Sequence, residues 1–161
     1  MKKESTSPEQ TPKGAPETLF QVTAGVYKIR TALNNSSLVD MALTENSDRT
    51  HNVKLYHAND EPESTWQIHQ APNGKYRIKN GKHAHLSLTT SDDWVIAKSD
   101  NTTYPNMWTF KKADDEFVFI EADSKVMDVR GSSTKDNTPI IVWPNQESRN
   151  QKFKLIKIRD L

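Results

Sequence analysis

This 161-residue chain contains no cysteine, so it has no thiol nucleophile, and its notable candidates for chemistry are paired acids, two histidines and a tryptophan. Asp92-Asp93 and the acidic run 114–116 each place acids side by side. Two carboxylates hydrolyse a glycosidic bond only when they face each other across a cleft, and these stand in polar segments that are typical of turns. His83 and His85 would share one face of a strand, as two zinc ligands can, but no third ligand stands near them.

Other signatures of catalysis are missing from the sequence as well. It has no glycine-rich phosphate loop and no G-x-S-x-G nucleophile motif. We therefore expect a protein that is not an enzyme and that needs neither a metal nor another cofactor.

Trp143 is the residue whose pattern points to a ligand. It ends an apolar segment, residues 140–143. Alternate residues of a strand face opposite sides, so Ile140 and Val142 would face the core while Ile141 and Trp143 face outward. An indole on the surface indicates a bound ligand or a protein partner.

Residues 140–143 belong to a pattern that occurs three times. The first apolar block of each repeat is 38–41, 86–88 or 126–129, and the second is 53–56, 95–98 or 140–143. Each repeat closes on an aromatic residue, which is Trp66, Trp108 or Phe153. The step from the end of the second block to that aromatic is the same every time, from 56 to 66, from 98 to 108 and from 143 to 153. Three copies at a period of roughly 40 to 50 residues predict a repeat architecture.

Short alternating segments between turn residues predict that the repeats are built from strands. Asn80-Gly81 separates the runs 75–79 and 82–88, which is a strong hairpin signal, and residues 72–74 (PNG) predict a second turn. About four strands in each repeat would make twelve. Closing them about a pseudo-threefold axis would remove most sheet edges, with the closing aromatics in the core. We expect an all-β fold over residues 19–161, with repeats at roughly 24–70, 71–112 and 113–158.

Composition and charge limit the partners. A net charge of +1 leaves no basic surface for nucleic acid or an anionic membrane, and no apolar run approaches the roughly 18 residues of a membrane span. Residues 1–18 contain almost nothing apolar, so we expect a disordered tail. The polar residues that follow Met1-Lys2-Lys3 do not form a signal peptide. We expect a cytoplasmic protein, unless it is secreted by a non-standard route.

The arrangement resembles the ricin-B-type β-trefoil lectins over residues of about 24 to 158. That family closes each repeat on a Q-x-W motif. Residues 151–153 (QKF) keep the Gln, while residues 64–66 (STW) and 106–108 (NMW) keep the Trp. The resemblance implies a β-trefoil that binds carbohydrate.

The resemblance also implies which residues bind sugar in the third repeat. In the family, an Asp accepts hydrogen bonds from two neighbouring hydroxyls, an aromatic ring stacks on the sugar, and an Asn donates to a hydroxyl. Asp128, Trp143 and Asn150 stand at these positions, followed by Gln151. A carboxylate can accept two hydroxyls, and a flat ring offers area to the apolar face of a galactose-like sugar. Ile141 replaces a polar residue of the family. Asp128 and Trp143 are both expected to face outward.

The first repeat carries part of this set. Asp40 and Tyr56 are in place, and Lys54 occupies the position of Ile141, whereas residues 63–64 (ES) replace the Asn-Gln pair. The resemblance therefore implies a partial sugar site in the first repeat.

The second repeat has Ser87 for the Asp and Lys98 for the aromatic, so it is expected to bind no sugar in this way. The family's commonest ligands are galactose and N-acetylgalactosamine. A shallow site for one sugar would bind on the order of millimolar. Useful avidity would need two sites in each chain or a homodimer.

Two alternatives to a lectin remain open at this point. Other β-trefoils inhibit proteases through a surface loop, and residues 31–37 or 92–93 could form one, although neither loop carries a distinctive bait residue. The chain could also be a trefoil without a working sugar site that serves as a targeting module of a toxin complex. Joint retention of Asp128, Trp143 and Asn150 favours the lectin, because an inhibitor does not need these three residues.

Overall fold

Twelve strands make up almost all of the regular structure in the part of the chain that the computed structural model describes, residues 18–99 and 107–161. The strands are β1 (Gly25–Thr31), β2 (Leu38–Glu45), β3 (His51–Tyr56), β4 (Trp66–Ala71), β5 (Lys75–Asn80), β6 (Leu86–Ser91), β7 (Trp94–Ser99), β8 (Thr109–Asp114), β9 (Phe117–Ala122), β10 (Lys125–Val129), β11 (Ile140–Trp143) and β12 (Phe153–Arg159). Single 3₁₀ turns stand at η1 (Pro62–Ser64), η2 (Pro72–Gly74), η3 (Arg130–Ser132) and η4 (Arg149–Gln151). The all-β prediction is confirmed.

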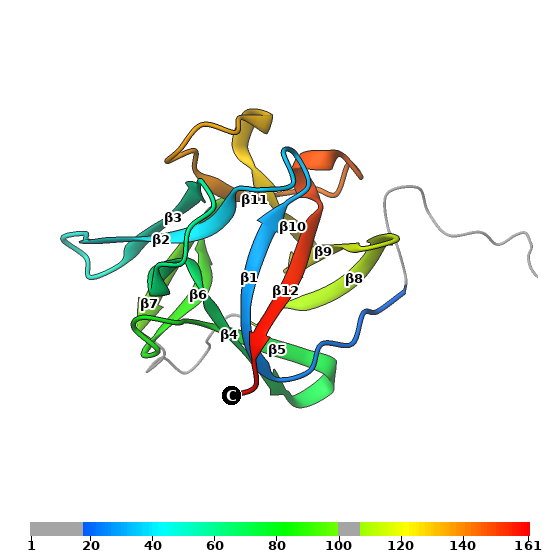
Figure 1. Ribbon diagram of the computed structural model, residues 1–161, viewed down its shortest axis with the longest axis horizontal. Helices are drawn as coiled ribbons and strands as arrows, with labels where there is room; N and C mark the ends of the chain where they lie inside the picture. The colour runs from blue at the N-terminus through cyan, green and yellow to red at the C-terminus, as the bar shows by residue number, and fades with distance from the viewer. Residues whose placement is uncertain (1–17, 100–106) are drawn as a thin grey trace, which may run out of the picture.

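Six strands close a barrel. β1 pairs with both β12 and β4, β4 pairs with β5, and β9 pairs with both β8 and β12. A bridge between Tyr76 of β5 and Trp108, just before β8, completes the ring. In Figure 1, β1 and β12 run side by side through the middle of the view. The predicted tail falls mostly on residues 1–17, which lie outside the described residues, whereas the carbonyl of Thr18 accepts a hydrogen bond from the Lys112 N–H (2.9 Å).

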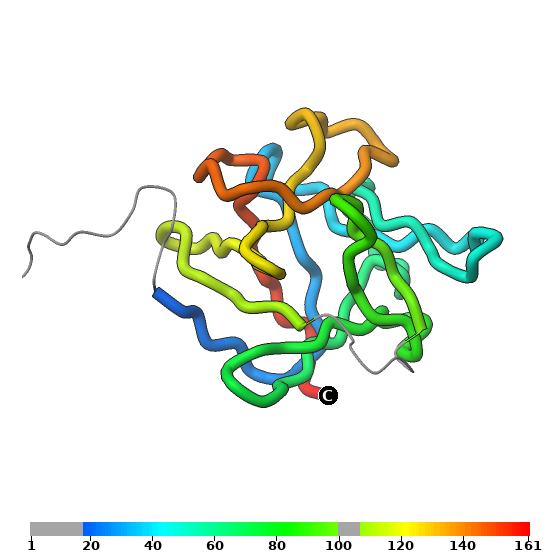
Figure 2. Tube along the Cα trace, turned by 180° about the vertical axis from the view of Figure 1, so that it is seen from behind, coloured from blue at the N-terminus to red at the C-terminus, as the bar shows by residue number. Residues whose placement is uncertain are grey.

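Three hairpins, β2–β3, β6–β7 and β10–β11, form a cap on the barrel. β3 pairs with β7, and β7 pairs with β11. Figure 2 shows the green β6–β7 hairpin beside the cyan β2–β3 hairpin. A bridge between Lys54 and Pro139 joins β3 to the start of β11. The hairpins therefore surround one axis, and the β-trefoil prediction is confirmed.

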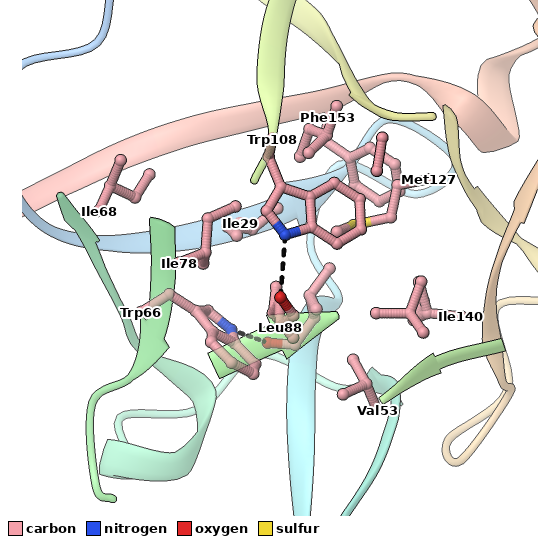
Figure 3. Close-up of a cluster of buried hydrophobic side chains, with 14 of the residues drawn as sticks. Ile29, Val53, Trp66, Ile68, Ile78, Leu88, Trp108, Met127, Ile140 and Phe153 are labelled. Atoms are coloured by element: carbon pink, nitrogen blue, oxygen red, sulfur yellow. Dashed lines mark hydrogen bonds between the residues drawn. The ribbon is translucent and has the colours of Figure 1, made fainter. Parts of the chain in front are cut away.

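The three closing aromatics fill the core. Trp66, Trp108 and Phe153 are fully buried and converge among aliphatic side chains in Figure 3. Both indoles donate from Nε1 to a strand carbonyl, Trp66 to Val39 (2.9 Å) and Trp108 to Leu88 (3.1 Å). These bonds satisfy the polar atom that a buried Trp carries.

The two predicted turns between strands had different outcomes. Asn73 and Gly74 adopt φ of 65° and 71°, and this turn joins β4 to β5 as predicted. The tight Asn80-Gly81 turn was predicted wrongly, because β6 begins only at Leu86. Asn80 is buried instead, and its Oδ1 accepts from the N–H of Lys82 (3.0 Å). A Cβ at Gly81 would lie 1.9 Å from the Thr65 hydroxyl, so the glycine permits a close approach to η1.

Candidate functional site

The outer face of the β10–β11 hairpin carries the predicted residues of the third repeat. Asp128 is paired with Ile141, and Val126 with Trp143. Paired residues of antiparallel strands point to the same side of the sheet. Val142 is buried while Trp143 is 42% exposed, as the alternation predicts. Asp128 and Trp143 are therefore diagonal neighbours on one face.

Two amides from the chain just before β12 hold the Asp128 carboxylate. Asn150 Nδ2 donates to Oδ1 (3.0 Å), and Gln151 Nε2 donates to Oδ2 (3.0 Å). Each carboxylate oxygen retains a lone pair for another donor. Burial raises the pKa of Asp128, and the hydrogen bonds from Gln151 and Asn150 partly oppose that rise. Asp128 is only 5% exposed, which is more buried than an outward strand position suggests, because these amides pack over its side.

Gln151 holds the Asp128 carboxylate from the buried side. It ends η4 and is fully buried. Its Nε2 also donates to the Pro144 carbonyl (3.0 Å), and its Oε1 accepts from the Gln146 N–H (2.8 Å). Its polar atoms therefore all serve the protein, and the geometry gives Gln151 a role in holding Asp128 and the loop that follows Trp143. Direct contact with a ligand is not the role that this geometry supports.

Asn150 lies nearer the surface than Gln151. Its Nδ2 donates to the Val129 carbonyl (3.1 Å) as well as to Asp128, and its Oδ1 accepts from the Ser148 hydroxyl (2.6 Å). Asn150 is half-buried, so a ligand seated on Asp128 would lie beside it.

The first repeat repeats this geometry with different side chains. Asp40 is paired with Lys54, and Leu38 with Tyr56. Lys54 Nζ binds Asp40 Oδ2 (2.5 Å) and lies 4.4 Å from the centroid of the Tyr56 ring. The Lys54 ammonium therefore covers both the carboxylate and the ring. A hollow of about 550 Å³ beside them includes all three residues.

Ser64 is a residue of the first repeat that the sequence interpretation missed. It ends η1, is fully buried, and donates from Oγ to Asp40 Oδ1 (2.6 Å). It thus does for Asp40 what Gln151 does for Asp128. Its place two residues before the closing Trp66 was the available signal.

The register of the second repeat differs from the sequence interpretation by two residues. Ser87 is paired with Lys98, and Thr89 with Ile96. Because Lys98 occupies the position of Trp143, Thr89 stands where the other repeats have Asp, and the assignment of Ser87 was wrong. Neither residue is an acid.

Three of the five acids that the sequence analysis singled out bind lysines. Asp93 pairs with Lys125 (2.8 Å), Asp114 with Lys152 (3.0 Å) and Glu116 with Lys154 (2.5 Å).

The two histidines lie in the loop before β6, not on a strand as predicted, with ring centroids 5.9 Å apart. Across residues 18–99 and 107–161 there is no group of three or more His, Cys, Asp or Glu side chains that could hold a metal. No helix in the described part of the chain is long and apolar enough to cross a membrane.

Comparison with family models matches the sequence to a known domain. The model of the ricin-type β-trefoil lectin domain matches residues 25–153. The chain belongs to this family. The match spans all three repeats, from β1 to the closing Phe153. No curated protein matches the chain.

Solved structures share the fold of this ricin-type domain at low sequence identity. The Rhizoctonia solani agglutinin superposes with a TM-score of 0.72 at 20% identity, over 86% of this chain and 99% of that one. A ricin B-like lectin of Macrolepiota procera, solved in complex with lactose, gives 0.70 at 18% identity over 86% and 100%. A proteinase inhibitor from Coprinopsis cinerea gives 0.69 at 10% identity over 86% and 100%. These likenesses establish the fold.

Proposed function

We propose that this domain is a lectin that binds galactose-type or N-acetylgalactosamine-type sugars, mainly through the third repeat. The observation that carries the proposal is the pairing of a held carboxylate with an exposed indole on one outer face. Asp128 offers acceptors to two hydroxyls, and Trp143 offers a flat surface to the apolar face of the sugar. Family membership and the lactose complex of the Macrolepiota procera lectin support a sugar of this type.

The first repeat is proposed as a subsidiary site. Lys54 occupies Asp40 and lies over Tyr56, so a sugar would have to displace the ammonium or accept a hydrogen bond from it. Removing the lysine ammonium from a nearly buried carboxylate costs free energy, because the carboxylate loses its partner charge. In the third repeat the supporting groups are neutral amides, and the Trp143 ring is open. This difference supports the third repeat as the stronger site.

Binding without catalysis is part of the proposal. The acids at 93, 114 and 116 are each paired with a lysine, which supports a structural role for them.

Two sites in each chain, or a homodimer, would raise the avidity of weak sites. Sedimentation of the purified protein would give its oligomeric state.

The test is retention of variants on immobilised galactose and N-acetylgalactosamine. Trp143→Ala and Asp128→Asn should each lose about 1–3 kcal/mol, or roughly 5- to 150-fold in affinity. Asn is preferred to Ala at Asp128 because it keeps the shape of the side chain and one acceptor oxygen for Asn150 or Gln151, whereas truncation would remove both bonds. Asp60→Asn, at a carboxylate that is 97% exposed, is the matched control and should bind like the parent.

The proposal fails if folded Trp143→Ala and Asp128→Asn are retained as well as the parent. The same proteins would then be assayed against serine and cysteine proteases, because residues 31–37 and 92–93 are the candidate inhibitory segments. Asn34 braces the loop at 31–37 by accepting from the N–H groups of Ser36 (3.1 Å) and Ser37 (2.9 Å).

A further inference from the structure

Trp94 is an exposed indole that neither the family resemblance nor the sequence pattern assigns. It is the first residue of β7, in the second repeat, and is 45% exposed. It is paired across the cap with Ile141 of β11. Ile141 is paired on its other side with Asp128 of β10. Trp94, Ile141 and Asp128 therefore form one row across three neighbouring strands on the outer face. Trp94 therefore extends the third-repeat site, although it comes from another repeat.

The two exposed indoles lie on adjacent strands. Trp143 stands two residues beyond Ile141, so it is a diagonal neighbour of Trp94, a relation that places backbones about 7–8 Å apart. Ile141, which replaces a polar residue of the family, lies between them and presents an apolar surface. Trp94 across the strand pair and Trp143 further along β11 therefore offer two stacking surfaces next to Ile141.

Arg130 fixes one side of the Trp94 ring. Its guanidinium carbon lies 5.4 Å from the ring centroid, within the range of a cation–π contact. Arg130 follows Asp128 by two residues and begins η3. A guanidinium carries five N–H donors, so donors remain for hydroxyls of a ligand that lies over Asp128 and continues toward Trp94.

A hollow of about 660 Å³ adjoins the indole on the axis of the trefoil. Three of the residues that line it hold equivalent positions in the three repeats, namely Asn52, Trp94 and Pro139. Each stands two residues before the residue that is paired with Asp40, Thr89 or Asp128 on the first strand of its own hairpin. Asn137 also lines the hollow. Side-chain amides beside an exposed indole are groups that recognise a sugar ring, since they pair with hydroxyls while the indole contacts C–H groups.

We propose that Trp94 and Arg130 form a second subsite, which receives the next sugar of an oligosaccharide whose terminal sugar lies on Asp128 and Trp143. The inference rests on the proposed function of the third repeat. It makes the ligand a chain of at least two sugars that runs from Trp143 past Ile141 toward the axial hollow. The second repeat then contributes to recognition through Trp94, although its own sugar position lacks an acid.

The experiment compares galactose, lactose and the galactose-terminated tetrasaccharide lacto-N-neotetraose by calorimetry on the full chain. The parent should bind the tetrasaccharide about tenfold more tightly than galactose, the effect expected of one added aromatic contact. Trp94→Ala should bring the tetrasaccharide to the galactose level and leave galactose binding unchanged. Trp94→Phe, which keeps a ring, should restore most of the preference. Ile158→Ala, at an exposed apolar residue of the barrel strand β12, should change neither affinity.

The outcomes separate the two proposals. A parent that binds all three sugars equally, or a Trp94→Ala variant that keeps the preference, overturns the subsite while the third-repeat site stands. Equal losses for galactose and tetrasaccharide in Trp94→Ala also overturn it, because they would place Trp94 in the first sugar position. A parent that binds none of the probes overturns the proposed function and the subsite together.

Discussion

Replacing Gln151 by Met should destabilise the domain strongly and weaken sugar binding through Asp128. Met has a similar shape but lacks the amide, so one hydrogen bond to a carboxylate and two to backbone groups are lost. A bond to a charged group contributes about 1.5–3 kcal/mol and a neutral one about 0.5–1.5 kcal/mol. Pro144 and Gln146 are exposed, so water can replace part of the loss. We expect a decrease of about 2–4 kcal/mol in the free energy of unfolding.

Urea unfolding followed by tryptophan fluorescence measures this loss, and the melting temperature should fall by roughly 5–15 °C for a chain of this size. Gln146→Met is the matched control, because only its backbone N–H is used, and it should stay within about 0.5 kcal/mol of the parent. Removing the Gln151 donor should also raise the pKa of Asp128 further, since that hydrogen bond favours the carboxylate. A loss below about 1 kcal/mol in Gln151→Met would refute the view that Gln151 holds the site together.

Three further predictions follow from contacts of the described residues. Lys54→Met should lower the free energy of unfolding by about 2–4 kcal/mol, because it leaves the nearly buried Asp40 without its cation. The control Lys28→Met, whose partner Asp60 is almost fully exposed, should lower it by less than about 1 kcal/mol. Urea titrations measure both values. Trp108→Phe should cost about 2–4 kcal/mol by differential scanning calorimetry, because it creates a void and leaves a buried carbonyl without its donor. Burial raises the pKa of Asp128 above its ordinary value of 3.8, so the folded protein favours the protonated carboxyl. The contribution of this group to the free energy of unfolding is therefore fully present below pH 3.8 and is lost as pH rises through the raised pKa. The stability of the parent relative to Asp128→Asn should therefore decrease over that interval, and a constant or increasing difference in urea titrations across pH would contradict the sign.

Spacing in the sequence was enough to predict the fold and the core aromatics. In the first and third repeats the constant step from the second block to the closing aromatic contains a 3₁₀ turn, η1 or η4, and ends where β4 or β12 begins. Alternation along 140–143 also predicted that Trp143 faces outward, since one buried side of a strand fixes the orientation of the other.

The remaining features depend on contacts that a local pattern does not contain. The register of the second repeat was misread because residue counts do not reveal which residues of β6 and β7 are paired, and Thr89 replaced Ser87 as a result. The Asn80-Gly81 turn gave way to tertiary packing, in which Asn80 is buried against the chain before β4. The place of Trp94 beside Ile141 depends on which hairpins become neighbours around the axis, and these residues are far apart in the sequence.

The three equivalent positions at the axis, Asn52, Trp94 and Pro139, have a consequence for how such a domain can change its ligand. Each of the three residues comes from a different repeat, and none of them belongs to the buried core. Ligand choice at the hollow can therefore vary one repeat at a time while the barrel keeps its packing. A library that randomises these three positions should yield folded proteins with altered sugar preferences, because the three side chains lie outside the buried core.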